Sequence, residues 1–423
     1  MESPFQIPSF KFFVTMRLML TIGAQLKGVI IGYYLYELTN NPLTIGIVGL
    51  CEALPFIALA LYAGYFVESR SKERMLKIVV TMMTINIGLL ALVPFLHGLS
   101  YISQHQAILL IYTLLVMRGA MNSFTPSASV STLSLMVPKT IMPKAAAISS
   151  TAWQVGAVVG PLTGAFLSYS TQSTNIDTIV FYSLILALFF HAFALFSLLN
   201  IKSNPAPIAP AEKPNMIAQI AEGLSYVFSN KILLYAISLD LFAVFFGGVT
   251  ALLPVFAKDI LHVNLDGLSW LRAALPLGSA VMMFYLSIHP PVRKSGYKLL
   301  YAVGLYGLCT IAFALSTNFY FSFFMLFLCG VFDSVSVIIR ATILQLQTPE
   351  TMKSRVTAVN SMFISSSNEL GAAESGIAAK IMGTIPSVLF GGSMTIFHCR
   401  IHLVQRKRIE GIRIKNVNSG YFS

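Results

Sequence analysis

Long apolar stretches alternate with short polar segments along almost the whole chain. Each stretch is about 20 residues long, which is the length that a helix needs to cross a bilayer and too long for a β-barrel strand. The pattern predicts an all-α polytopic membrane protein whose transmembrane helices form two six-helix halves. We expect twelve helices, near residues 12–35, 45–66, 76–96, 107–128, 145–167, 178–199, 232–254, 268–288, 298–316, 320–341, 356–379 and 385–404.

Composition and charge agree with a membrane protein. The 423 residues are 56% hydrophobic and 10% charged, whereas soluble proteins carry about 25% charged residues. The formal net charge of +12 does not indicate nucleic acid binding, because the basic residues gather in alternate loops. Such loops face the cytoplasm under the positive-inside rule, and the opposite loops contain only Lys258 and Lys380. We therefore expect a multi-pass protein of the cytoplasmic (inner) membrane with both termini in the cytoplasm.

The longest polar connection divides the chain near its middle. Residues 200–215 are too rich in proline to form a helix, and residues 217–231 have the amphipathic pattern of a helix that lies on the inner membrane surface. We expect a first half at 1–199, a cytoplasmic linker at 200–230, a second half at 231–404 and a basic cytoplasmic tail at 405–423.

An internal repeat supports the division into halves. Residues 136–150 align without a gap with residues 347–361. Repeated halves of this kind place the substrate path between them, near the middle of the bilayer. The same register matches Gly119 with Gly330 and Gly160 with Gly371.

The fifth predicted helix has a face of small residues. Gly156, Gly160 and Gly164 are spaced four apart, so they lie on one side of the helix and let a neighbouring backbone approach closely. Pro161 removes a hydrogen-bond donor beside this face and is expected to bend the helix there. The glycine spacing alone is also typical of an ordinary close-packed transmembrane helix.

The combined glycine and proline spacing resembles the fifth-helix antiporter motif of exporters in the major facilitator superfamily. The resemblance implies two six-helix halves that work by alternating access around a central cavity. It also implies that the fifth helix presses on the eighth helix of the other half through its glycine face and seals the inward-facing side against leak.

The segment that follows the second predicted helix carries a second resemblance. Residues 64–74 are similar to the loop between helices 2 and 3 of the superfamily, with Glu in place of the usual Asp and no Gly in the turn. The resemblance implies that the acid latches one conformation by pairing with basic groups. The alternative is a basic turn that only sets membrane topology. The residues in comparable positions are Gly64, Glu68, Arg70 and Arg74.

Polar residues inside the predicted helices are candidates for the substrate and proton pathway, because facing lipid costs them several kcal/mol. Gln25 lies deep in the first helix, and Arg118 resembles the helix 4 arginine that the superfamily links to proton coupling. A buried carboxyl group can also exchange a proton near neutral pH. The other candidates are Asn122, which shares a helical face with Arg118, and Glu52, Asp240, Asp333, Asn368, Glu369 and Glu374.

Residues 365–376 form the most polar segment at membrane depth. Together with the first helix and residues 64–74, this segment resembles the enterobactin-exporter branch of the superfamily. The branch exports siderophores and related small molecules by proton antiport. The resemblance weakens after residue 397, where the sequence His-Cys-Arg-Ile-His interrupts the apolar pattern. We therefore expect the twelfth helix to be short or aberrant, and suspect a divergent or frame-shifted C-terminus.

The sequence contains no phosphate-binding loop, no metalloprotease or hydrolase motif and no cysteine pattern typical of a metal site. The hypothesis is a monomeric secondary active transporter, not an enzyme, without a cofactor or metal. It would use the proton gradient to export a small amphipathic molecule, siderophore or drug-like, by alternating access. The open alternatives are a solute:proton uptake symporter, a membrane-embedded enzyme, and a non-transporting sensor or decayed transporter.

Overall fold

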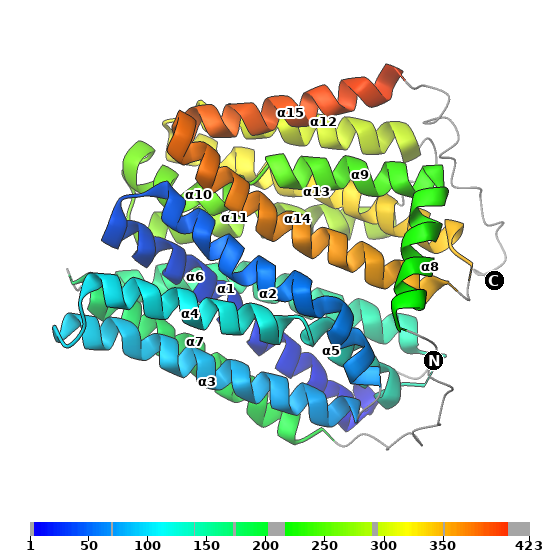
Figure 1. Ribbon diagram of the computed structural model, residues 1–423, viewed down its shortest axis with the longest axis horizontal. Coiled ribbons are helices and arrows are strands. Elements are labelled where there is room, and N and C mark those ends of the chain that lie inside the picture. The colour runs from blue at the N-terminus through cyan, green and yellow to red at the C-terminus, as the bar shows by residue number, and fades with distance from the viewer. Residues whose placement is uncertain are drawn as a thin grey trace. The chain divides into compact units, whose positions relative to one another are not determined.

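The computed structural model describes residues 4–68, 71–138, 140–171, 175–201, 216–289, 295–349 and 352–404, and every regular element in these ranges is helical (Figure 1). Its long helices are α1 (Pro8–Thr39), α2 (Pro42–Glu68), α3 (Lys72–Gly98), α4 (Gln104–Asn122), α5 (Thr125–Met136), α6 (Met142–Thr171), α7 (Ile176–Leu199), α8 (Met216–Ser229), α9 (Lys231–Phe246), α11 (Leu265–Ile288), α12 (Ser295–Ala314), α13 (Phe319–Gln347), α14 (Lys353–Met382) and α15 (Thr384–Val404).

Each of the twelve predicted transmembrane helices overlaps a helical stretch of the structure. In the described ranges, nine helices are long and apolar enough to cross a membrane, while α6, α14 and α15 are long but more polar. The predicted seventh helix, 232–254, corresponds to α9 and α10 (Val249–Val255), and a π-helical turn, η2 (Phe256–Ile260), follows it. The all-helical polytopic fold predicted from the apolar pattern is confirmed.

Local capping fixes several helix starts. The side-chain oxygen of Ser103 accepts a hydrogen bond from the Gln106 backbone N–H, and the side-chain oxygen of Gln106 accepts one from the Ser103 backbone N–H, which is a capping box. Asn175, Asn230 and Asn318 cap α7, α9 and α13 through their side-chain oxygens. These polar residues separate consecutive apolar stretches, so the same positions that interrupt the hydrophobic pattern also start the helices.

The expected break in the last helix does not occur. α15 runs from Thr384 to Val404 through the His-Cys-Arg-Ile-His segment. The ring of His398 stands 4.5 Å from the ring of Phe242, and the buried Cys399 thiol lies 3.9 Å from the carbonyl oxygen of Leu300. Packing against neighbouring helices therefore accommodates these residues. The basic tail at 405–423 lies outside the described residues.

Two compact units make up the chain. The first comprises Met1–Lys213 and Thr250–Ala273, and the second comprises Pro214–Val249 and Ala274–Ser423. Each has its own buried apolar core: Phe10, Phe13 and Leu76 belong to the first, and Leu239, Leu299 and Ile339 to the second. The halves and linker expected at 1–199, 200–230 and 231–404 remain a proposal, and residues 202–215 of that linker lie outside the described residues.

The glycine face of α6 packs mainly on α1 of its own unit. A Cβ atom on Gly156 would lie 2.8 Å from Cβ of Thr21, and one on Gly160 would lie 2.6 Å from Cβ of Gln25. Only Gly164 also meets α11, where Ser269 Oγ would lie 3.1 Å from the added atom. The expectation that this face presses on the eighth helix of the other half stays a prediction, while its contact with α1 is close at Gly156 and Gly160. Spacing defines a small face but not the helix opposite it.

The internal repeat is visible in the packing. Gly119 of α4 lies against the backbone of Glu52 in α2, and its match Gly330 of α13 lies against the backbone of Leu275 in α11. In the same way Gly160 of α6 packs on α1, and its match Gly371 of α14 packs on the backbone of α9. Each unit thus contains the same two close helix contacts, which supports the repeat proposed from the aligned glycines.

The amphipathic helix α8 packs on α9 and α14. Val227 is fully buried there beside Val356 and Val359, and Glu222 forms an ion pair of 2.5 Å with Arg355. The Tyr226 hydroxyl group donates a hydrogen bond of 2.5 Å to the backbone oxygen of Gln347. The apolar side of this helix therefore contacts protein through Val227, and not only the membrane surface that its sequence pattern suggested.

Substitution of Gly160 by Ala should lower the free energy of unfolding by about 1–3 kcal/mol, because the new methyl group overlaps α1. The added Cβ atom would stand 2.8 Å from the backbone oxygen of Ile22. Gly304→Ala in α12 is the matched control, since nothing lies within 4 Å of its added atom. SDS titration of the purified protein in mixed micelles measures both variants. Equal stabilities would contradict close packing of α1 on α6.

Candidate functional site

Three charged side chains meet inside the first unit. Lys27 Nζ of α1 lies 2.6 Å from Glu52 Oε1 of α2, and Arg118 Nε of α4 lies 4.0 Å from the same oxygen. The side chains of Lys27, Glu52 and Arg118 are 6%, 21% and 10% exposed. These three residues, which we call the charged cluster, therefore bring two cations onto one carboxylate in a largely buried setting.

Close helix packing holds the charged cluster in place. The missing side chain of Gly119 lets α4 rest directly on the α2 backbone, where a Cβ atom would lie 2.9 Å from Cα of Glu52. Gly119 follows Arg118 in sequence, so the close approach also positions the guanidinium group beside Glu52. Asn86 of α3 adds a hydrogen bond of 3.0 Å from its side-chain nitrogen to the Leu114 backbone oxygen in α4.

A buried histidine lies in electrostatic range of the cluster. His191 of α7 is 0% exposed and interacts with Arg118 and Lys27. Its Nδ1 atom lies 2.9 Å from the backbone oxygen of Ala187, so Nδ1 is the nitrogen that carries the proton. Gly23 of α1 leaves room for the ring, because a Cβ atom there would lie 2.5 Å from His191 Nδ1. The ring therefore contributes to the α1–α7 contact near the cluster.

Two networks of hydrogen-bonded polar side chains involve residues near the C-terminal end of α1. Tyr34 donates a hydrogen bond of 2.5 Å to Asp177, and His97 Nδ1 lies 2.9 Å from the same carboxylate oxygen. Lys258 bonds Glu37 at 2.7 Å and Asn40 at 2.8 Å, while the Tyr36 hydroxyl group donates to Asp259. In these networks Asp177, Glu37 and Asp259, which are acids of the first unit near helix ends, each accept a hydrogen bond.

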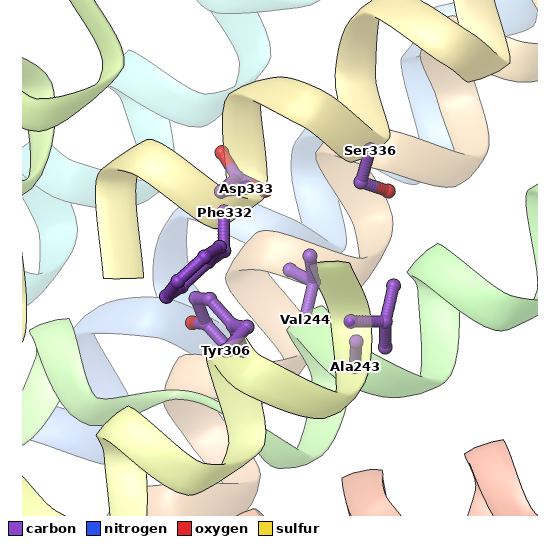
Figure 2. Close-up of a pocket in the computed structure, with 7 residues that line it drawn as sticks. Ala243, Val244, Tyr306, Phe332, Asp333 and Ser336 are labelled. Atoms are coloured by element: carbon purple, nitrogen blue, oxygen red, sulfur yellow. The ribbon is translucent and has the colours of Figure 1, made fainter. Parts of the chain in front are cut away.

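Asp333 occupies a different setting, in the second unit (Figure 2). It lines a cavity of about 10 Å³ together with residues of α9, α12 and α13. Within the described ranges, no lysine or arginine forms an ion pair with Asp333. The other lining residues are Ala243, Val244, Val303, Tyr306, Phe332 and Ser336.

Several predicted pathway residues lie apart from the charged cluster. Gln25 lies at the contact between α1 and α6, where a Cβ atom on Gly160 would stand 2.6 Å from the Gln25 Cβ atom, and its role in the pathway remains a prediction. Asn122 is exposed at the end of α4, whereas Arg118, with which it was expected to share a helical face, is buried. The reason is that α4 ends at Asn122, one turn beyond the close contact with α2.

The polar segment of α14 and the proposed latch are described only in part. Asn368 is exposed, Glu369 and Glu374 are half-buried, and the Ser375 hydroxyl group lies 3.4 Å from Glu374 Oε2. Gly64 belongs to α2, Pro161 to α6, and Arg74 is exposed on α3. The side chains of Glu68, Arg70 and Asp240 lie outside the described residues, so the latch and the role of Asp240 remain predictions.

Sequence reasoning named Arg118 and Glu52 separately but did not join them to Lys27. The charged residues inside the predicted helices indicate this grouping, because a lysine and an arginine at membrane depth require a nearby acid. Glu52 is the single acid within the first six predicted helices. The charge count therefore could have predicted the cluster.

Replacement of Glu52 by Ala should lower the free energy of unfolding by about 3–5 kcal/mol, because two buried cations would lose their counter-ion. Glu222→Ala is the control, since this acid is 53% exposed in its pair with Arg355 and should cost about 0.2–1 kcal/mol. SDS unfolding in mixed micelles compares the two variants. A Glu52 variant no less stable than the control would contradict the geometry of the cluster.

Comparisons with known proteins agree with this architecture. The sequence profile of the Major Facilitator Superfamily matches residues 13–372. The enterobactin exporter of Escherichia coli O1:K1 / APEC is 24% identical over 387 residues, covering 91% of this chain and 88% of the relative. The enterobactin exporter of Citrobacter koseri is also 24% identical, over 388 residues with the same coverage.

Solved structures show the same fold at low identity. A bacterial homolog of the human lysosomal transporter Spinster, in an inward-facing and occupied conformation, has a TM-score of 0.70 at 14% identity and covers 98% of this chain and 99% of its own. A D-xylose–proton symporter has a TM-score of 0.70 at 13% identity, with coverages of 94% and 97%. The profile match spans most of the chain, and this multi-pass protein therefore belongs to the major facilitator superfamily of secondary transporters, which are not enzymes.

Proposed function

We propose that this transporter exports a small amphipathic molecule, siderophore or drug-like, in exchange for protons. Its similarity to enterobactin exporters extends over 91% of the chain, which supports export of a related class of molecule. The proposal places a monomer in the cytoplasmic (inner) membrane with both termini in the cytoplasm. That orientation follows from the basic loops and the positive-inside rule.

The observation that carries proton coupling is the setting of Asp333. Its carboxyl group lines a cavity of about 10 Å³, which is close to the smallest volume that holds one water molecule. A carboxyl group beside water and without a paired cation can take up and release a proton. Glu52 differs, because Lys27 and Arg118 stabilise its negative form. We therefore assign proton transfer to Asp333 and not to Glu52.

The predicted gating residues take a modified role in this proposal. Gly156, Gly160 and Gly164 join α6 to α1, so that the two helices move as one body during the transport cycle. Alternating access would then involve movement of compact units with rigid interiors. In the second unit, the matching contact at Gly371 joins α14 to α9, so that these two helices also move as one body.

Inside-out membrane vesicles with an acidic lumen test proton-coupled export. Adding a transported compound outside should raise the luminal pH, because protons leave as the compound enters. Enterobactin and a set of amphipathic dyes are the first compounds to add. Asp333→Asn should abolish the pH change, since an amide group cannot carry the proton.

Asp266→Asn is the matched control, because this carboxyl group is exposed at the start of α11 and should leave the pH change intact. A full response from Asp333→Asn would refute the assigned proton site. Luminal acidification on adding a compound would instead assign symport. An unchanged luminal pH with every compound, from folded wild-type protein, would contradict the proposed export.

A further inference from the structure

The side chain of Tyr306 in α12 reaches both the Asp333 cavity and the end of a neighbouring helix. It lines the cavity together with Asp333, and the two groups lie within electrostatic range of each other (Figure 2). The Tyr306 hydroxyl group donates a hydrogen bond of 3.2 Å to the backbone oxygen of Gly247, which directly follows α9. All three residues belong to the second unit. One side chain therefore links the proposed proton site to the backbone at the end of α9.

The helical run is interrupted at Gly247 and Gly248. α9 ends at Phe246, and α10 begins at Val249. The Gly247 backbone oxygen accepts a hydrogen bond of 2.6 Å from the Val249 backbone N–H, two residues further on, which is the pattern of a tight turn and not of an α-helix. A side-chain hydrogen bond to Gly247 therefore contributes to holding the backbone at this break.

The break is packed on α12 and α14 of the second unit. A Cβ atom on Gly247 would lie 2.9 Å from a ring carbon of Tyr306, and one on Gly248 would lie 2.7 Å from the backbone oxygen of Gly371. The chain passes from the second unit to the first directly after Val249. A change at the break therefore acts where the chain connects the two units, which is a suitable place to link proton binding to movement.

The Tyr306 hydroxyl group has one proton to donate and two acceptors that can compete for it. An ionised carboxylate accepts a hydrogen bond roughly twice as strong as a neutral carbonyl oxygen does. The cavity of about 10 Å³ is close to the smallest volume that holds one water molecule, and such a water can relay the bond to Asp333. Loss of the Asp333 proton through this water therefore creates a competitor for the bond to Gly247.

We propose that Tyr306 is a positioning residue that transmits the protonation state of Asp333 to the break at Gly247. Protonated Asp333 leaves the hydroxyl group on Gly247 and holds the backbone there, whereas ionised Asp333 draws the hydroxyl group away and loosens the break. Tyr306 keeps its own proton in both states and changes only its acceptor. This inference rests on the proposed function, because it extends proton transfer at Asp333 to the conformation of the same transporter.

Other titratable or charged residues lie in the middle of the helices around Asp333, and the test has to separate them. They are Cys309 of α12, Cys329 and Arg340 of α13, Asp240 of α9, and Glu369 and Glu374 of α14. Cys329 interacts with the Asp333 carboxyl group, and the side chain of Asp240 lies outside the described residues. Replacement of Asp333 alone must therefore remove the pH response of the break.

Hydrogen–deuterium exchange of the full-length protein in lipid nanodiscs tests the coupling at the break itself. Backbone amides at 246–251 are followed at about pH 5 and about pH 9, a range that covers the titration of buried carboxyl groups. Comparing each variant with the wild type at the same pH removes the intrinsic effect of pH on amide exchange. Asp333→Asn should exchange about two- to tenfold more slowly than the wild type at the higher pH, because one hydrogen bond to the break is restored, and equally fast at the lower pH.

Tyr306→Phe should show the opposite pattern. Without the hydroxyl group, the break should exchange about two- to tenfold faster than the wild type at the lower pH and equally fast at the higher pH. Tyr301→Phe is the matched control, since this side chain of α12 is 64% exposed and should leave the exchange unchanged. Equal acceleration by Tyr306→Phe at both pH values would reveal a purely structural bond and overturn the inference.

Two further variants assign the titration to Asp333. Asp240→Asn and Glu369→Gln should keep the pH response of the break. Loss of the response in either variant, with an unchanged response in Asp333→Asn, would overturn the inference. If Asp333→Asn fails to fold, the pattern of Tyr306→Phe at the two pH values decides alone.

The vesicle assay distinguishes this inference from the proposed function. Intact proton exchange in vesicles, with a break that does not respond to Asp333→Asn, would discard only the role of Tyr306. A pH response that requires both Asp333 and Tyr306, without proton exchange for any compound, would discard proton-coupled export and keep the link to the break.

Discussion

The first unit depends on the close approach of α1 to its neighbours. Glycines make this possible from both sides: Gly156 and Gly160 of α6 rest on α1, and Gly23 of α1 makes room for the buried His191 ring of α7. In a bilayer, helices gain little from apolar contact alone, so close packing of this kind provides much of their association. Because α1 carries Lys27, its placement also sets the position of the charged cluster.

The cost of placing charge inside the bilayer is a second constraint. The first unit and the second unit satisfy it in different ways. In the first unit, Glu52 is held between two cations and remains in its charged form. In the second, Asp333 lines a small cavity without an ion pair to any described cation. An acid held by cations is suited to fixing structure and charge balance, whereas an acid beside a water-sized cavity is suited to exchanging a proton. The two settings support separate roles in one transport cycle.

The internal repeat explains why the same contacts occur twice. Gly119 and Gly330 occupy matching positions on α4 and α13, and each removes a side chain where two helix backbones meet. The side chains next to these matching glycines differ in chemistry. Arg118 precedes Gly119, whereas Cys329 precedes Gly330. A symmetric framework with unlike polar residues is consistent with transport that binds two different species, a substrate and a proton.

The sequence by itself determined the helices, the repeat and the polar positions at membrane depth, because apolar length and residue spacing act locally. It also indicated the superfamily, through residues 145–168. Only the tertiary structure decided that Gly160 faces α1, that Arg118 meets Glu52 and Lys27 while Asn122 stays outside, and that α15 continues through His398. Those outcomes depend on how each helix is rotated and which distant helix lies opposite, and side-chain packing across the whole unit sets both.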